Sequence, residues 1–184
     1  MFRYPLSADA ELRLLEMHHA AQVFDLVDQN REHLRRWLTW VDTTQTGSDS
    51  RTIIRNGLQQ FADNRGCSAG IWYQGALAGV IAYHYLDWRD SKTEFGYWLG
   101  ESFQGHGLMT SACQALVTHA FEELSLNRVE IFCASGNTKS RAIPERLGFT
   151  QEGVLRQAEW LHDRFVDQVV YGMLASEWAH KSHS

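Results

Sequence analysis

The 184-residue sequence contains only two prolines and three cysteines, and it has no long apolar run. The cysteines, Cys67, Cys113 and Cys133, are odd in number and lack the spacing of metal ligands, so we expect reduced thiols rather than disulfides or a zinc site. No apolar segment approaches the roughly 20 residues that a membrane span needs. The first residues also lack the apolar core of a secretory signal. These absences favour a cytoplasmic protein with no membrane partner.

Basic residues are in the minority, since 17 lysines and arginines stand against 22 aspartates and glutamates, for a formal net charge of −5. A nucleic-acid-binding protein normally carries a basic stripe, so this balance argues against a nucleic-acid partner. It weakly favours a positively charged or amine substrate. The nine histidines are scattered along the chain, and we expect no metal site.

The sequence does contain clear changes of hydrophobic period. Its length suffices for one well-filled core, so we expect a single domain over residues 1–184. Helical spacing and strict alternation of apolar residues predict helices and strands in turn. The order is strand, helices, three strands, helix, strand, helix and two strands, which favours a mixed α/β (α+β) sheet. The predicted segments are a strand at Glu11–Leu15; helical segments over 20–27, 34–38 and 47–61; strands at Ser68–Tyr73, Leu77–Tyr85 and Glu94–Leu99; a helix over 110–124; a strand at Arg128–Ala134; a helix at Ser140–Leu147; and strands at Val154–Leu161 and Val166–Leu174.

Two local features refine this order. The long helix connects the strand at Glu94–Leu99 to the strand at Arg128–Ala134, and such a crossover is right-handed and makes the two strands parallel. Pro144 lies inside the helix at Ser140–Leu147, where it lacks the amide that an interior position needs. We therefore expect that helix to be distorted or to begin late.

The most informative motif for function is the turn Gln104-Gly105-His106-Gly107-Leu108-Met109, between the strand at Glu94–Leu99 and the helix that begins near Thr110. Glycines at such a junction let the backbone approach a ligand closely. Successive amides and the positive end of the helix dipole form a site for phosphate groups. The turn predicts a cofactor that carries a pyrophosphate.

Several motifs together resemble the GCN5-related N-acetyltransferase (GNAT) superfamily, and within it the RimJ/RimL ribosomal-protein N-terminal acetyltransferases. The resemblance implies a mostly antiparallel central sheet, flanked by helices, with a splay between two parallel middle strands. It also implies acetyl-CoA as the cofactor. The motifs are Glu94-Phe95-Gly96-Tyr97-Trp98-Leu99, Gln104-Gly105-His106-Gly107, Asn137-Thr138-Lys139-Ser140, Leu147-Gly148-Phe149 and Gln157-Ala158-Glu159-Trp160-Leu161.

The resemblance also implies where acetyl-CoA lies. Its pantetheine arm would pair with the strand at Glu94–Leu99, and its pyrophosphate would lie on amides of the turn. Met109 departs from the family pattern, because it occupies a position where the family usually has Gly or Ala. The implied cofactor-binding residues are Trp98, Leu99, Gln104, Gly105, His106, Gly107, Leu108, Met109, Thr110, Asn137 and Ser140.

The implied reaction is direct attack of an amine on the thioester in a ternary complex. An α-amine has a pKa of about 7.7–8.0, so keeping it neutral at pH 7 costs only about 1 kcal/mol. Glu159 is the first candidate for the base or for holding the amine, and Glu94 is the second; the alternative for each is a salt-bridged or surface carboxylate. Ser140 is the candidate donor to the departing sulfur, with helix N-capping as its alternative. The expected substrate-binding residues are Trp37, Trp40, Glu94, Tyr97 and Glu159.

Cys133 gives a different mechanism, because its thiol would lie near the thioester and would accept the acetyl group itself. A buried cysteine, however, usually behaves as a small apolar residue.

We therefore expect an acetyl-CoA-dependent N-acetyltransferase that acts on the N-terminal α-amine of a protein, with a ribosomal protein as the candidate implied by the resemblance. Acetylation of a small amine, an amino-acid conjugate or an antibiotic is the alternative within the same chemistry. A non-catalytic acyl-CoA-binding module is the alternative from another class. The resemblance also suggests a homodimer.

Overall fold

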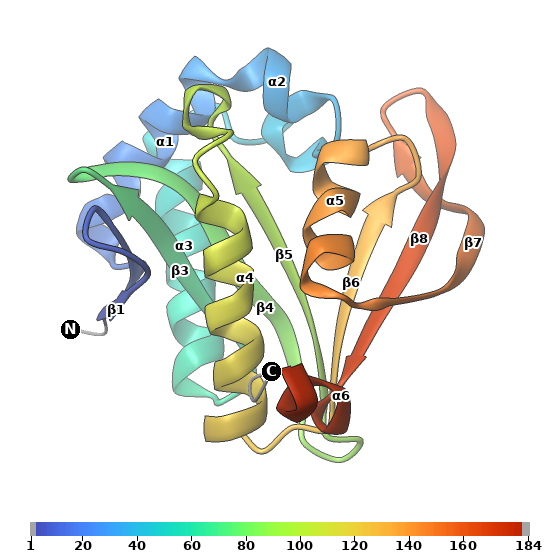
Figure 1. Ribbon diagram of the computed structural model, residues 1–184. Helices are drawn as coiled ribbons and strands as arrows, with labels where there is room; N and C mark the ends of the chain where they lie inside the picture. Colours follow the sequence, from blue (N-terminus) through green and yellow to red (C-terminus); the bar gives the residue numbers. More distant parts are fainter. Residues whose placement is uncertain (1–2, 182–184) are drawn as a thin grey trace.

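A computed structural model describes residues 3–181, and its centre is one eight-stranded sheet in the order β1-β2-β3-β4-β5-β6-β8-β7 (Figure 1). Neighbouring strands are antiparallel, except for the parallel pair β5 and β6. This arrangement confirms the mixed, mostly antiparallel sheet. The strands are β1 (Arg3–Pro5), β2 (Ala10–Leu14), β3 (Cys67–Tyr73), β4 (Ala76–Asp87), β5 (Lys92–Leu99), β6 (Arg128–Ala134), β7 (Thr150–Leu161) and β8 (Arg164–Leu174).

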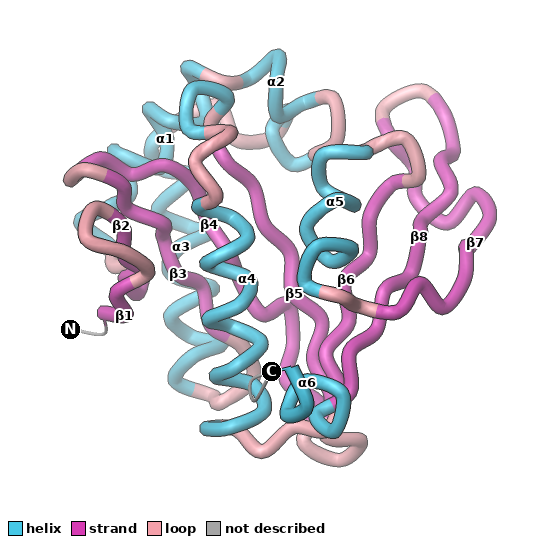
Figure 2. The backbone as a smooth tube through the Cα atoms, viewed as in Figure 1, coloured by secondary structure: helices cyan, strands magenta, loops and turns pink. Residues whose placement is uncertain are grey.

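Helices cover both faces of the sheet. Helices α4 and α5 lie on one face and α1 and α3 on the other, while α2 follows α1 at the upper end of the sheet (Figures 1 and 2). Among residues 3–181, no helix has the length and apolar character to cross a membrane. The helical segments are η1 (Met17–His19), α1 (Ala20–Gln29), α2 (Arg31–Arg35), η2 (Thr39–Asp42), α3 (Gly47–Ala62), η3 (Glu101–Phe103), α4 (Leu108–Thr118), η4 (His119–Glu123), α5 (Thr138–Leu147) and α6 (Ala175–Lys181).

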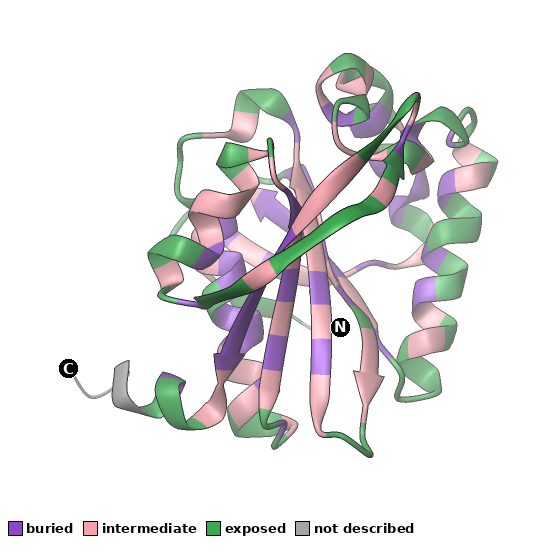
Figure 3. Ribbon diagram, turned by 90° about the vertical axis from the view of Figure 1, so that its right-hand side faces the viewer, coloured by how far each residue is buried: buried purple, intermediate pink, exposed green. Residues whose placement is uncertain are grey.

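The core lies between α4 and the middle of the sheet. Phe95, Val117 and Ile131 are buried there, together with other residues of α4, β4, β5 and β6. A second buried cluster packs α1 and α3 against the opposite face around Trp72. Figure 3 shows the buried positions concentrated in the central strands, whereas the edge strand β7 is mostly exposed. The middle strands are therefore fixed on both faces, and they are the rigid elements on which a site is built.

The parallel pair opens after three residues. Strands β5 and β6 pair only from Lys92 to Glu94, against Arg128 to Glu130, although β5 continues to Leu99 and β6 to Ala134. The two strands diverge toward their carboxyl ends (Figure 1). This confirms the expected splay, and it leaves backbone groups of both strands free to face a ligand.

Several predicted boundaries are wrong. The helix predicted over 34–38 ends at Arg35, so that Trp37 and Leu38 lie in a loop and Trp40 lies in η2. The helix predicted from 110 to 124 begins at Leu108 and becomes a π-helix after Thr118. The short elements β1, η1 and α6 were not predicted, because three to seven residues carry too little periodicity to distinguish them from loops.

Of the two alternatives expected at Pro144, a distorted helix or a late start, the late start is wrong, since α5 begins at Thr138, earlier than predicted. Pro144 has no N–H, so the carbonyl of Ser140, four residues earlier, receives no helical hydrogen bond from it. The Tyr97 hydroxyl donates to that carbonyl instead, at 3.0 Å. A side chain of β5 thus satisfies the acceptor that proline leaves open, and it ties α5 to the splayed part of the sheet.

Candidate active site

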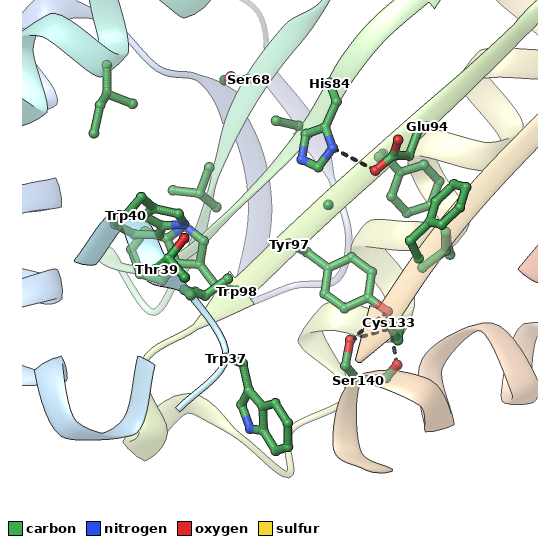
Figure 4. Close-up of a pocket in the computed structure, with 18 of the residues that line it drawn as sticks. Trp37, Thr39, Trp40, Ser68, His84, Glu94, Tyr97, Trp98, Cys133 and Ser140 are labelled. Atoms are coloured by element: carbon green, nitrogen blue, oxygen red, sulfur yellow. Dashed lines mark hydrogen bonds and ion pairs between the residues drawn. The ribbon is translucent and has the colours of Figure 1, made fainter. Parts of the chain in front are cut away.

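Two cavities meet where β5 and β6 splay. A cavity of about 890 Å³, called here the donor cavity, lies between the 104–111 segment, α5 and α2. A second cavity of about 520 Å³, called here the acceptor cavity, extends from the splay toward α1 and α3 (Figure 4). The residues that line both are Trp37, Leu38, Tyr97, Trp98, Asn137 and Ser140. Molecules bound in the two cavities would therefore touch at these side chains.

The turn that leads into α4 lines the donor cavity with main-chain amides. Gly105 and Gly107 have φ angles of 84° and 74°, in the left-handed region that favours glycine, and a Cβ at either position would meet no protein atom within 4 Å. The N–H groups from Gly105 to Thr110 form no hydrogen bond with the described residues 3–181. A helix N-terminus with free amides fits a phosphate-bearing ligand, so the residues present suit the pyrophosphate of acetyl-CoA.

The side chains of Met109 and His106 both pack against other parts of the protein. The Met109 side chain is 6% exposed and belongs to the main core, so it is accommodated without closing the donor cavity. The His106 ring stacks on Tyr73 of β3, with ring centroids 5.2 Å apart, and does not line the cavity. Except for His106, every residue expected to bind the cofactor, Met109 included, lines the donor cavity.

The donor cavity also has basic residues that were not predicted to bind the cofactor. Lys139 Nζ donates to Gln104 Oε1 at 2.7 Å, and Arg146 donates to the Thr110 hydroxyl at 2.8 Å. His33 of α2 completes this group through Gln104, at 2.9 Å between the two Nε2 atoms. Burial lowers the pKa of His33. Lys139 and Arg146 are cations, so the cavity suits an anionic ligand. They and His33 come from helices that the turn motif alone does not place nearby.

The acceptor cavity carries the two expected carboxylates. Glu94 on β5 and Glu159 on β7 both line it, as do Trp37 and Trp40. Gln168 of β8 donates to Glu159 Oε2 at 3.1 Å. The register between β7 and β8 skips from Leu155 to Glu159, and this bulge precedes the carboxylate. Such carboxylates give the cavity an anionic wall, which attracts an ammonium group.

At the junction of the cavities, the Tyr97 and Ser140 hydroxyls lie 3.4 Å apart, and the Cys133 thiol lies 3.3 Å from the Ser140 hydroxyl (Figure 4). Asn137 is the N-cap of α5, with its side-chain oxygen accepting from the Ser140 amide at 3.2 Å. The alternative of Ser140 as the N-cap is therefore wrong. Its hydroxyl instead faces the place where the two cavities join.

Cys133 is buried, and that burial raises the pKa of its thiol. Since the thiolate is the nucleophilic form, a raised pKa argues against acetyl transfer to this residue. All three cysteines are free, as expected.

One residue of the acceptor cavity escaped sequence reasoning. His84 of β4 lines it, and its Nδ1 lies 3.0 Å from Glu94 Oε1 (Figure 4). The alternation of the predicted strand gives no sign of this position, because His84 is the extra residue of a bulge between Tyr83 and Tyr85.

The chain is similar to known acetyltransferases. A family model described as "Acetyltransferase (GNAT) domain" matches residues 10–150. The chain is 42% identical to the "Putative ribosomal N-acetyltransferase YdaF" of Bacillus subtilis, over 97% of this chain and 98% of that one. It is 30% identical to the "Ribosomal-protein-serine acetyltransferase" of Escherichia coli, over 92% and 94% of the two chains. It resembles a solved structure of RimL, a ribosomal L7/L12 alpha-N-protein acetyltransferase in complex with coenzyme A as a CoA–cysteine disulfide, with a TM-score of 0.92 and 29% identity over 96% of this chain and 99% of that one.

Proposed function

The chain belongs to the acetyltransferase (GNAT) domain family, and from that premise we propose that it acetylates the N-terminal α-amine of a ribosomal protein. It is an N-acetyltransferase that uses acetyl-CoA. The proposal concerns the acceptor, the residues and the course of the reaction. Relatives named for ribosomal proteins support the acceptor, and one of them is named for serine.

The observation that carries the proposal is the meeting of two cavities of unlike chemistry at Tyr97 and Ser140. One cavity offers free main-chain amides and basic side chains for an anionic donor, and the other offers carboxylates for an ammonium group. Direct attack requires that amine and thioester lie in contact, with no covalent enzyme intermediate. A junction lined by residues of both cavities supports such a ternary complex.

Each proposed residue has a task within this complex. The amides of Gly105–Thr110 hold the pyrophosphate, and Lys139 and Arg146 add positive charge beside it. Ser140 donates a hydrogen bond to the sulfur as it departs; a hydrogen bond to a charged group is worth about 1.5–3 kcal/mol. Glu159 holds the acceptor ammonium. In RimL, coenzyme A forms a disulfide with a cysteine. In this chain the Cys133 thiol lies 3.3 Å from the Ser140 hydroxyl, and we place the thiol end of coenzyme A near these two residues.

The pKa of the acceptor amine and the aromatic lining of the cavity favour a chain terminus as the acceptor. An α-amine costs only about 1 kcal/mol to keep neutral at pH 7, against about 4.6 kcal/mol for a lysine side chain, so the site needs no strong base. Trp37, Trp40 and Trp98 line the acceptor cavity, and the Trp40 and Trp98 ring centroids lie 5.8 Å apart. Such aromatic walls suit the first residues of a peptide.

The test is an acetyl-transfer screen with [¹⁴C]acetyl-CoA over three kinds of amine: serine-initiated peptides from the L7/L12 N-terminus, polyamines, and aminoacyl compounds. We expect the peptides to give the highest kcat/KM, with the label on the α-amine by tandem mass spectrometry. A peptide with a blocked α-amine and a free lysine is the matched control and should remain unlabelled. Exclusive labelling of the small amines would contradict the proposed acceptor and establish the small-amine alternative.

A homodimer is part of the proposal. The hairpin of β7 and β8 exposes Val154, Leu155, Trp160 and Phe165, and the last two pack edge to face with centroids 4.8 Å apart. An exposed apolar group on an edge strand is a common site of association. Sedimentation equilibrium should give twice the monomer mass, and W160E should lower it; a monomer at micromolar concentration would contradict this part.

A further inference from the structure

His84 occupies a β-bulge at the wall of the acceptor cavity. Tyr83 pairs with Phe95 and Tyr85 pairs with Glu94, so His84 has no partner residue on β5. The extra residue of a bulge turns a side chain away from the direction that strict alternation would give it, and bulges are frequent beside active sites. The His84 side chain is 53% exposed and lines the acceptor cavity (Figure 4).

Gly96 makes room for the His84 ring. A Cβ at Gly96 would lie 2.5 Å from His84 Nε2 and 2.6 Å from Cε1, closer than real contacts allow. Gly96 has no positive φ and pairs regularly with Ala82, so the backbone itself does not require glycine there. Glycine at this position therefore lets the imidazole lie against the strand, and a larger residue would displace the ring.

Glu94 fixes the orientation of the same ring. The Glu94 Oε1 atom lies 3.0 Å from His84 Nδ1. Glu94 is two residues before Gly96, so the two residues share one face of β5. A carboxylate that accepts from Nδ1–H leaves the lone pair on Nε2. His84 Nε2 has no hydrogen-bond partner among the described residues of the chain. The free nitrogen thus belongs to a ring that Glu94 orients and for which Gly96 leaves room.

We propose that His84 is the base that accepts the proton of the acceptor amine, and that Glu94 is the residue that positions it. This inference deepens the proposed function and rests on it. Nε2 takes one proton from the ammonium; the neutral amine forms the new N–C bond while the C–S bond breaks. The thiolate takes the second amine proton, by way of the Ser140 hydroxyl or water. The imidazolium, stabilised by Glu94, returns its proton to solvent through its exposed edge.

This assignment separates the two carboxylates of the cavity. Glu94 acts through His84, whereas Glu159 lies on β7 and accepts from Gln168. Glu159 then serves to bind the ammonium rather than to carry its proton away.

The first experiment is chemical rescue. With acetyl-CoA and the serine-initiated L7/L12 peptide, H84A should lower kcat/KM for the peptide by about 100-fold, the lower range for general base catalysis. The Kd of acetyl-CoA should not change, because His84 lies outside the donor cavity. Added imidazole should restore turnover, and more basic imidazoles should restore it faster. H18A is the matched control, since His18 also has a glutamate partner, Glu16 at 3.7 Å, but lines neither cavity.

A rate of H84A close to that of the wild type, or a loss that no imidazole restores, would overturn the proposal. If the wild-type enzyme does not acetylate the peptide, the proposed acceptor fails, and the same comparison is made with the amine of highest turnover in the screen.

The second experiment needs no acceptor. Long-range ¹H–¹⁵N NMR of the free enzyme, with the His84 signal identified by its loss in H84Q, should show a proton on Nδ1 and an unprotonated Nε2. E94Q and G96A should each disturb that signal, the first by removing the carboxylate and the second by displacing the ring. A proton on Nε2 in the wild type would contradict the proposal, whatever the acceptor is.

Discussion

The donor cavity takes its central feature from one continuous stretch of chain, whereas the acceptor cavity collects side chains from elements far apart in the sequence. Main-chain amides of Gly105–Thr110 form the first, and residues of η2, β4, β5, β6 and β7 form the second. A backbone site depends on local conformation, which two glycines encode. A side-chain site depends on tertiary packing and on strand bulges, which no local pattern encodes. We therefore expect a substitution in one cavity to change the binding of that cavity's own ligand, acetyl-CoA or the acceptor, and to leave the binding of the other ligand unchanged.

The largest effect is expected at Gly107. G107V should weaken acetyl-CoA binding by roughly 100-fold, because it adds strain of about 1–2 kcal/mol at a left-handed position and disturbs contacts to a charged group. Isothermal titration measures the Kd. G75V is the matched control, since Gly75 has a φ of 82° and the same open space but lies in the hairpin of β3 and β4. Equal Kd values for the two variants would remove the turn from cofactor binding.

Ser140 tests the junction of the two cavities. S140A should lower kcat by roughly 10- to 100-fold, the value of a hydrogen bond to a charged sulfur, and leave the Kd of acetyl-CoA within about twofold. Steady-state and binding measurements separate these quantities. S102A, an exposed serine of η3 outside both cavities, should change neither. Unchanged turnover in S140A would exclude its role toward the sulfur.

Glu159 tests the acceptor cavity alone. E159Q should raise the KM of the acceptor by about fivefold, close to 1 kcal/mol for a partly exposed charge pair, without affecting the Kd of acetyl-CoA. E32Q, an exposed glutamate of α2 that lines neither cavity, is the control. An effect of E159Q on donor binding instead would show that the two cavities are not separate in function.

The link between α5 and β5 predicts a smaller effect on stability. Y97F leaves the Ser140 carbonyl without its donor and should cost about 1 kcal/mol in the free energy of unfolding. P144A supplies a helical N–H to that carbonyl, so Y97F should cost less in the P144A background. Urea unfolding of the four proteins gives this cycle. Equal costs of Y97F in both backgrounds would show that the tyrosine does not replace the missing proline donor.

The smallest expected effect is on the pH dependence of stability. Burial lowers the pKa values of His19, His33 and His119 from about 6.5. Below pH 6.5 these histidines bind protons in the unfolded chain while they are still neutral in the folded chain. Their contribution to the free energy of unfolding is therefore complete above pH 6.5 and is lost as the pH falls through their folded-state pKa values. Urea midpoints at pH 7.5 and 5.5 measure the loss, and H119Q should reduce it. A midpoint that rises toward pH 5.5 would have the wrong sign.

The sequence allowed much of the donor side to be predicted. The strand at Glu94–Leu99, the glycine turn and the following helix are contiguous, and their local signals agree with the fold. The parallel pair and its crossover followed from topology alone. His106 remains a predicted cofactor-binding residue through its main-chain amide. The stacking of its ring on Tyr73 was not predicted, because that contact joins segments far apart in the sequence.

The acceptor side was predicted less completely. Glu94 and Glu159 came from resemblance, whereas His84 required the bulge in β4 and the absent side chain at Gly96, which appear only when two strands are paired. The late start expected at Pro144 was wrong for a similar reason. The residue that compensates for its missing amide, Tyr97, is 47 positions earlier in the sequence and becomes its neighbour only in the folded chain.

A crystal structure of the protein with coenzyme A is the decisive experiment for the donor cavity. Diphosphate oxygens should lie within about 3.2 Å of main-chain nitrogens between Gly105 and Thr110, with the thiol end directed toward Ser140. Coenzyme A bound away from this turn, with those amides still free of phosphate, would rule out the turn as the pyrophosphate site and with it the mechanism proposed for Ser140.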